Sequence, residues 1–311
     1  MLNNFKPDST LHKAYKIDGA VVLRGLLSHD FISVIQEHFQ HLVSSPTDKY
    51  QSGFSRVGYD LFEDLDILNP LLSNPDFRDL MFALHEEELI FTQALGFELL
   101  ANSSSGFPWH IGTQSFGFQR AEDFGCTIWI PLVNINPKGK RGGMKYVKRS
   151  DISGEFMYQS VDPKVFEILE KREAEGEEVS VEEYKMLRDG PLNDPGMSQI
   201  LGSYEVEPEL ALGDAILFDK NIIHSSVPLL SHDTDSRQAL AIRFISPNSR
   251  FDHQRANRLE IPRRMLDFRG PTSFHLTLGL EDGQLLKDSP KLAPTLEKRW
   301  LVRPESEGFK L

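Results

Sequence analysis

Cysteine is almost absent from this chain, and the one present, Cys126, excludes two kinds of protein. A single cysteine cannot close an intramolecular disulfide, and it cannot furnish a zinc site built from several thiolates. Cys126 lies in an apolar run, where we expect a buried structural thiol. Stability must therefore come from an apolar core, for which 311 residues, 40% of them hydrophobic, are sufficient.

Long hydrophobic runs and an excess of basic charge are also missing. No stretch approaches a membrane span, and the first residues lack the apolar segment of a signal peptide. The 34 basic residues are outnumbered by 46 acidic ones, and a net charge of −12 repels polyanions. We therefore expect a cytoplasmic protein with neither a membrane nor a nucleic acid as partner.

The order of sequence patterns indicates a β core with helices attached. Residues 14–43 combine a short apolar β run with a helix that begins after Ser28, and a second helix is expected over 76–91. From about Phe97, short apolar runs alternate with Gly, Pro, Asn and Ser, which favours an all-β core over βαβ units. These runs are 98–101, 109–118, 126–133, 143–147, 204–208, 215–218, 224–228 and 239–245.

Residues 161–194 interrupt the β pattern with a highly charged helix and a second, shorter one. The simpler interpretation is a solvated helical insertion, and the alternative is a lid over a cavity. We expect the whole chain, 1–311, to form one domain around the β core.

Two histidines in strand-like contexts carry the chemistry. His110 follows Phe107-Pro-Trp, and His224 follows the turn and apolar strand that begin at Gly213. An oxygen-activating iron site usually takes two histidines and a carboxylate, with His-x-Asp on one strand. The residue two places after His110 is Gly112, so the third ligand is missing and a coordination position is left open. His85-Glu-Glu is rejected as the motif, because residues two apart diverge on a helix.

Side chains near these histidines complete a predicted cavity. Arg237 and Arg243 are expected on the strand after His224, an even number of residues apart, and a guanidinium suits the carboxylate of a 2-oxo acid. The period-two series after Gly112 predicts three further cavity-lining residues, with ordinary inward packing as the alternative for the two phenylalanines. These residues are Gln114, Phe116 and Phe118, and Trp129 is expected in the core or in the pocket wall.

In order and spacing, residues 14–250 resemble the phytanoyl-CoA dioxygenase family of iron(II)/2-oxoglutarate oxygenases. The segments that carry the resemblance are Ile17–Leu27, Trp109–His110, Gly142–Val147 and Gly213–Asp219 followed by His224. The resemblance implies a mainly β fold, a double-stranded β-helix (jelly roll, cupin-like) with flanking N-terminal helices and the helical insertion. It also implies iron(II), 2-oxoglutarate and O2 as cofactors, with His110 and His224 as metal ligands.

Gly112 departs from the family, whose hydroxylases carry aspartate there. Iron-dependent halogenases of this fold have Ala or Gly at that position and bind halide in its place, and the spacing of Arg237 and Arg243 after His224 is also similar to theirs. By that resemblance Arg237 serves 2-oxoglutarate and Arg243 supports the halide or the cosubstrate. Chloride would balance the iron charge as a carboxylate does, while remaining a transferable ligand. We therefore favour a halogenase that acts on an unactivated C–H bond of a small molecule in specialised metabolism.

Two alternatives remain open. A hydroxylase of the same fold would accept water beside Gly112 or take a ligand from elsewhere, such as Glu122 or Asp123, although these two also suit a solvated turn. A non-catalytic binding module would have lost the iron. The acidic surface favours a free substrate over one tethered to an acidic carrier protein.

Overall fold

The alternating apolar runs form two antiparallel sheets whose facing sides enclose part of the core. The computed structural model describes residues 3, 9–46, 49–61, 66–139, 142–230, 235–266, 273–290, 292 and 297–301. The larger sheet has the strand order β1-β7-β4-β9-β3-β10, with β2 also paired to β3, and the smaller sheet has the order β6-β5-β8. This is the mainly β, jelly-roll architecture that the sequence predicts.

The longest strands are β3 and β9, which are neighbours in the larger sheet. The bounds of the strands are β1 (Ala20–Leu23), β2 (Arg56–Gly58), β3 (Leu89–Leu100), β4 (Gly125–Pro131), β5 (Met144–Val147), β6 (Glu205–Val206), β7 (Ala215–Asp219), β8 (His224–Ser226), β9 (Ser236–Ile245) and β10 (Trp300–Leu301). The helices are α1 (Ser9–Asp18), α2 (His29–Leu42), α3 (Asn69–Leu72), α4 (Pro75–His85), α5 (Asp162–Glu175), α6 (Val181–Asn193), α7 (Pro195–Tyr204) and α8 (His253–Leu266).

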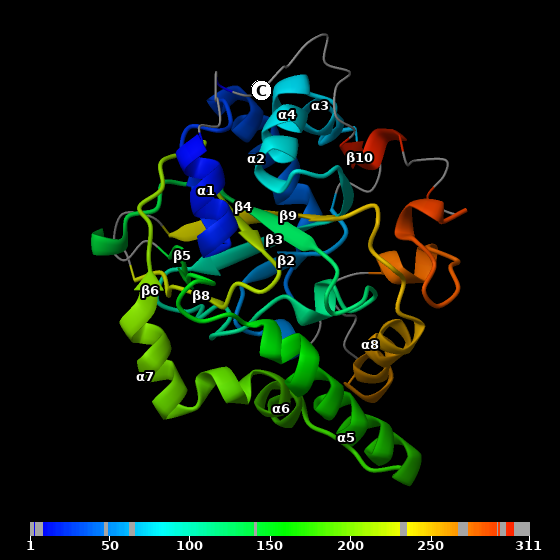
Figure 1. Ribbon diagram of the computed structural model, residues 1–311. Coiled ribbons are helices and arrows are strands. Elements are labelled where there is room, and N and C mark those ends of the chain that lie inside the picture. The colour runs from blue at the N-terminus through cyan, green and yellow to red at the C-terminus, as the bar shows by residue number, and fades with distance from the viewer. Residues whose placement is uncertain are drawn as a thin grey trace.

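The two faces of the larger sheet bury different partners. Side chains of α1, α2 and α4 share one apolar cluster with alternate residues of β4, β7 and β9, including Ile128, Leu240 and Ile242. On the opposite face, Trp129 and Ala241 pack with Tyr146 of the smaller sheet. Figure 1 shows the N-terminal helices gathered on one side of the sheets and α5, α6 and α7 extending on the other.

The N-terminal elements largely follow the sequence pattern. Ser28 caps α2 as predicted, since its hydroxyl accepts a hydrogen bond from the Phe31 amide at 3.3 Å. The second predicted helix is wrong at its C-terminal end. It stops at His85, where Glu86 has a positive φ of 61°, and Leu89–Phe91 begin β3 instead. A short apolar run is compatible with a helix and with a strand. Here the run forms a strand, in which Ile90 and Phe91 pair with β9.

The strand predicted over 109–118 is also wrong, except for a single bridge at His110. His110 forms a single bridge to His224, and the chain then turns into a 3-10 helix, η2 (Thr113–Ser115). The helical insertion occurs where predicted, but it starts with a π-helix, η4 (Met157–Val161), and its helices continue through α7 to Tyr204. Helix α8 lies after the last predicted β run, 239–245, where the sequence analysis identified no helix.

Candidate metal centre

The structure brings His110 and His224 side by side from segments far apart in the sequence. The amide of each donates a hydrogen bond to the carbonyl of the other, at 2.9 and 3.0 Å. Their ring centroids are 4.2 Å apart. This paired bridge fixes both backbones, so the two imidazoles are held together by the strand β8 and the segment before η2.

Each imidazole is oriented by a backbone carbonyl two residues before it. The carbonyl oxygen of Pro108 lies 2.8 Å from Nδ1 of His110, and that of Ile222 lies 2.9 Å from Nδ1 of His224. A carbonyl only accepts, so each Nδ1 must be the protonated nitrogen and each Nε2 carries the lone pair. Desolvation lowers the pKa of both rings, and for His224 the neighbouring His110 lowers it further. Two neutral imidazoles with Nδ1 fixed in this way fit the requirements of metal ligands.

Gly112 lies where the chain leaves the bridge and enters η2. Its φ of −79° and ψ of 34° are accessible to any residue, so the backbone does not require glycine. A Cβ built there would lie 3.4 Å from two ring carbons of Phe116 and 4.0 Å from the hydroxyl oxygen of Tyr158. These are ordinary van der Waals distances, so the position has room for at least a methyl group.

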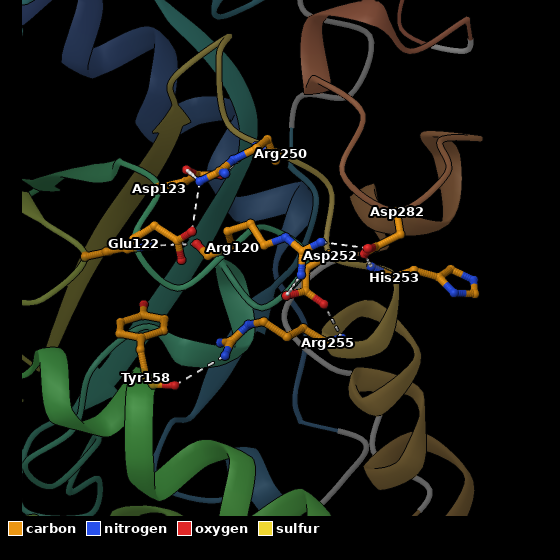
Figure 2. Close-up of polar contacts among 10 residues, drawn as sticks. Arg120, Glu122, Asp123, Tyr158, Arg250, Asp252, His253, Arg255 and Asp282 are labelled. Atoms are coloured by element: carbon orange, nitrogen blue, oxygen red, sulfur yellow. Dashed lines mark hydrogen bonds and ion pairs between the residues drawn. The ribbon is translucent and has the colours of Figure 1, made fainter.

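No third protein ligand accompanies the histidines in the part of the chain that the structure describes. Within those residues, no group of three or more His, Cys, Asp and Glu side chains is placed to hold a metal ion. Figure 2 shows Glu122 and Asp123 turned toward Arg250, which donates to Glu122 at 2.8 Å and to Asp123 at 3.1 Å. Their carboxylates are thus engaged in surface ion pairs, as in the solvated-turn interpretation.

The inner face of β9 forms one wall beside the histidines. Arg237, Ala239, Ala241 and Arg243 alternate along it, and the two small alanines separate the two guanidinium groups. Two adjoining cavities of about 40 and 60 Å³ lie against this wall, and both are lined by His110 and Arg243. The cavity with Gly112 also contains Gln114, and the one with His224 also contains Arg237 and Trp129.

Arg237 is a buried cation with little to balance its charge. Its Nε donates to the Gly142 carbonyl at 2.7 Å, and its guanidinium lies over the Trp129 ring at 5.6 Å. Burial lowers its pKa to about 9, and no charged group among the described residues contributes to the shift. A guanidinium that is positioned by a carbonyl and an aromatic face is prepared for an anionic ligand.

Arg243 lies closer to the Gly112 end of the cavities. Its guanidinium is stacked over the Phe116 ring at 5.6 Å, and burial lowers its pKa to about 10. Its Nε and one Nη have no hydrogen-bond partner among the described residues. Buried N–H groups that lack an acceptor are costly, so a ligand that accepts from them would be bound favourably.

The other predicted pocket residues divide between cavity and core. Gln114 reaches the cavity and donates to the Tyr184 hydroxyl at 2.5 Å. Phe116 and Phe118 belong to an apolar cluster, where Phe118 packs against Phe274 with centroids 5.4 Å apart. Because 111–118 is not a strand, the period-two argument for these phenylalanines does not apply, and their burial agrees with the core interpretation.

The helical insertion supplies cavity residues that the sequence analysis missed. Arg188 of α6 lines the same cavity as Gly112 and lies over the Tyr50 ring at 4.9 Å. Asn193, the last residue of α6, accepts from the Trp109 amide at 3.1 Å and donates to the Trp109 carbonyl at 2.7 Å. The insertion thus contacts the backbone next to His110, and no local sequence signal marks that long-range contact.

Comparisons with known proteins show a shared fold. No protein-family model and no curated protein matches the chain. Among solved structures, the epimerase SnoN in complex with Fe3+, alpha ketoglutarate and nogalamycin RO is 16% identical, with a TM-score of 0.57 over 89% of this chain and 94% of that one. The non-heme alpha ketoglutarate dependent carbocyclase SnoK from nogalamycin biosynthesis is 13% identical, with a TM-score of 0.55 over 79% and 87%. EctD from S. alaskensis with 2-oxoglutarate and 5-hydroxyectoine is 13% identical, with a TM-score of 0.54 over 81% and 80%.

At these identities the likeness establishes the fold alone. Among the described residues, none of the helices has the length and apolar character of a membrane span.

Proposed function

We propose that this protein is an iron(II)/2-oxoglutarate-dependent enzyme that halogenates an unactivated C–H bond of a small molecule. The observation that carries the proposal is the pair of neutral imidazoles of His110 and His224, with Gly112 beside them and no third acidic ligand among the described residues. Solved proteins of the same fold are described with iron and 2-oxoglutarate, which supports the choice of cofactors.

The residues present fit these groups. His110 and His224 would hold iron through Nε2, and Arg237 would bind a carboxylate of 2-oxoglutarate, whose negative charge would balance the buried guanidinium. Iron(II) with 2-oxoglutarate and O2 supplies the oxidising power for C–H activation, releasing succinate and carbon dioxide. Arg243 would attract chloride toward Gly112, where aspartate would repel the anion and fill its place. The small cavities bounded by apolar and aromatic side chains would limit water near the reacting carbon.

An anaerobic titration tests this function. The apoprotein is titrated with iron(II) and 2-oxoglutarate, with and without chloride, and the visible 2-oxoglutarate-to-iron charge-transfer band is recorded. The halogenase predicts a band that shifts with chloride, a tighter apparent affinity for 2-oxoglutarate, and no band in His224→Ala. A band that ignores chloride would favour a hydroxylase of this fold. Absence of any band in the wild-type protein would overturn the metal assignment and leave a non-catalytic binding module.

A further inference from the structure

Tyr158 carries a buried hydroxyl group for which the fold offers no partner. The side chain is fully buried in η4, the π-helix that opens the insertion, and its Oη has no hydrogen-bond partner among the described residues. A buried hydroxyl without a partner destabilises the folded chain, so its retention calls for an explanation. Single π-turns of this kind are frequent at functional sites.

The hydroxyl is directed at the space beside Gly112. Tyr158 Oη lies 4.0 Å from the Cβ position built on Gly112, and two ring carbons of Phe116 lie 3.4 Å from the same position. An aspartate at position 112 would extend from this Cβ, so Oη adjoins the place that a ligand atom would take instead. The segment that leads into η2 therefore meets η4 at this point, where the Tyr158 hydroxyl has no hydrogen-bond partner among the described residues.

The backbone of Tyr158 accepts a hydrogen bond, and two cationic side chains lie over its ring. The backbone carbonyl of Tyr158 accepts a hydrogen bond from Arg255 at 3.3 Å. Figure 2 shows the phenol ring pointing away from this contact. Lys220 Nζ lies 4.9 Å from the ring centroid and the Arg255 guanidinium 5.7 Å from it. Burial raises the pKa of the phenol well above its usual value, so the hydroxyl keeps its proton and acts as a donor.

A second set of donors converges on the same point. Arg243 interacts electrostatically with Tyr158, stacks on the Phe116 ring and has unpartnered Nε and Nη groups. A neutral O–H donor and a buried guanidinium, with an aromatic ring between the two elements, form a small site for an anion. Two carboxylates also act on Tyr158, and each is paired with a cation: Asp162 with Arg255 and Asp219 with Arg149.

We propose that Tyr158 donates a hydrogen bond to a single-atom anion, chloride in preference to larger halides, in the space beside Gly112. This assignment rests on the proposed function, because the anion is the halide of that reaction. Tyr158 is then a positioning residue that determines halide affinity and selectivity. The insertion contributes directly to the anion site and is more than a solvated addition.

The test compares Tyr158→Phe with Tyr15→Phe. Tyr15 has the same chemistry, a buried Oη without a partner among the described residues, but it belongs to α1 and packs in the core cluster on the helical side of the larger sheet. Chloride and bromide dissociation constants are measured by the anaerobic charge-transfer titration. Tyr158→Phe is expected to raise the chloride constant about tenfold or more, as for loss of a hydrogen bond to a charged group, and to reduce the preference for chloride over bromide. Tyr15→Phe should leave both constants unchanged.

The outcomes separate the two proposals. If the wild-type band responds to chloride and Tyr158→Phe retains the wild-type chloride constant, the role of Tyr158 is overturned while the halogenase survives. If the wild-type band ignores halide, the proposed function itself fails. A structure of the wild-type protein with iron, 2-oxoglutarate and bromide gives an independent check, because anomalous scattering locates the bromide. Bromide within hydrogen-bonding distance of Tyr158 Oη supports the inference, and bromide located elsewhere overturns it.

Discussion

At the scale of single residues, the proposed halogenation depends most directly on Gly112. Substitution by aspartate would add a carboxylate in the space where we propose that chloride binds. Gly112→Asp is expected to abolish the chloride response of the charge-transfer band, because the carboxylate fills the site and repels the anion. The measurement is the anaerobic titration, followed by mass spectrometry of products once a substrate is known.

Gly112→Ala is the matched control for this substitution. A Cβ at this position meets the Phe116 ring at 3.4 Å, an ordinary contact, so alanine should fold normally and keep the chloride response. If Gly112→Asp still responds to chloride as the wild type does, chloride does not bind beside residue 112.

His85 is a residue whose effect appears in the pH dependence of stability. Burial, with smaller effects of Lys16 and His12, lowers its pKa from 6.5 to about 3. Between these pH values the unfolded chain binds more protons at this position than the folded one. The free energy of unfolding therefore falls as the pH drops below 6.5, by at most about 1.4 kcal/mol per pH unit from this residue.

Replacement of His85 by glutamine should remove that contribution. Urea unfolding at about pH 7.5 and pH 5 is expected to show a smaller loss of stability in His85→Gln than in the wild type. His253→Gln, at an exposed position on α8, serves as the control. An equal loss on acidification in His85→Gln and the wild type would show that other buried groups account for the acid sensitivity.

At the scale of elements, the insertion and the candidate metal centre are coupled through Asn193. Its side chain bonds both the amide and the carbonyl of Trp109, the residue before His110. Asn193→Ala is expected to weaken iron(II) binding in the presence of 2-oxoglutarate about tenfold, because supporting contacts orient metal ligands. Hydrogen exchange at the Trp109 amide should accelerate in the same variant.

A substitution elsewhere in the insertion distinguishes a specific effect of the Asn193 contact from a general destabilisation of the insertion. Gln199 is exposed on α7, so Gln199→Ala should change neither iron affinity nor exchange at Trp109. Unchanged iron affinity in Asn193→Ala would mean that the bridge between His110 and His224 is sufficient to hold the ligands.

A sequence pattern predicts an element correctly when it is compatible with only one kind of secondary structure. Repeated apolar runs bounded by turns, such as 126–133 and 215–218, correctly predict β4 and β7 because several neighbouring runs support the same sheet. The alternation over 109–118 was misleading, since Phe116 and Phe118 reach the core equally well from turns. Spacing from His224 suggested Arg237 and Arg243, and β9 does place both on its cavity face.

Side chains that enter the site from outside the strands could not be predicted. Tyr158 approaches Gly112 from η4, whose short sequence carries no signal for this placement, and Arg188 lines the cavity from α6, whose charged sequence indicates only an exposed helix. Their placement depends on long-range packing, for example the paired contact of Arg258 on α8 with Glu170 on α5 at 2.9 and 3.0 Å. Helix α8 was itself missed because it is rich in charge and contains Pro262.

At the scale of the whole molecule, the two sheets and the insertion collect positive charge inside a protein of net charge −12. Arg237 and Arg243 both line the cavity that contains His224, and burial lowers the pKa of each guanidinium group. Burying cations without counter-charges costs stability, and the folded chain accepts that cost at the place where we propose that anions bind. Binding of the proposed anions at this site is therefore expected to raise the free energy of unfolding of the whole chain.

Ligand binding should consequently raise the melting temperature of the entire chain. Iron(II) with 2-oxoglutarate at about 100 times the dissociation constant contributes on the order of 2.7 kcal/mol, roughly 5 °C for a protein of this size. Anaerobic thermal denaturation measures the shift, and a chelator should reverse it. Addition of chloride should raise the melting temperature further in the wild type but not in Gly112→Asp. His224→Ala lacks one proposed ligand and should show little shift; if it is stabilised as much as the wild type, iron binds at another position and the two-histidine centre is not the site.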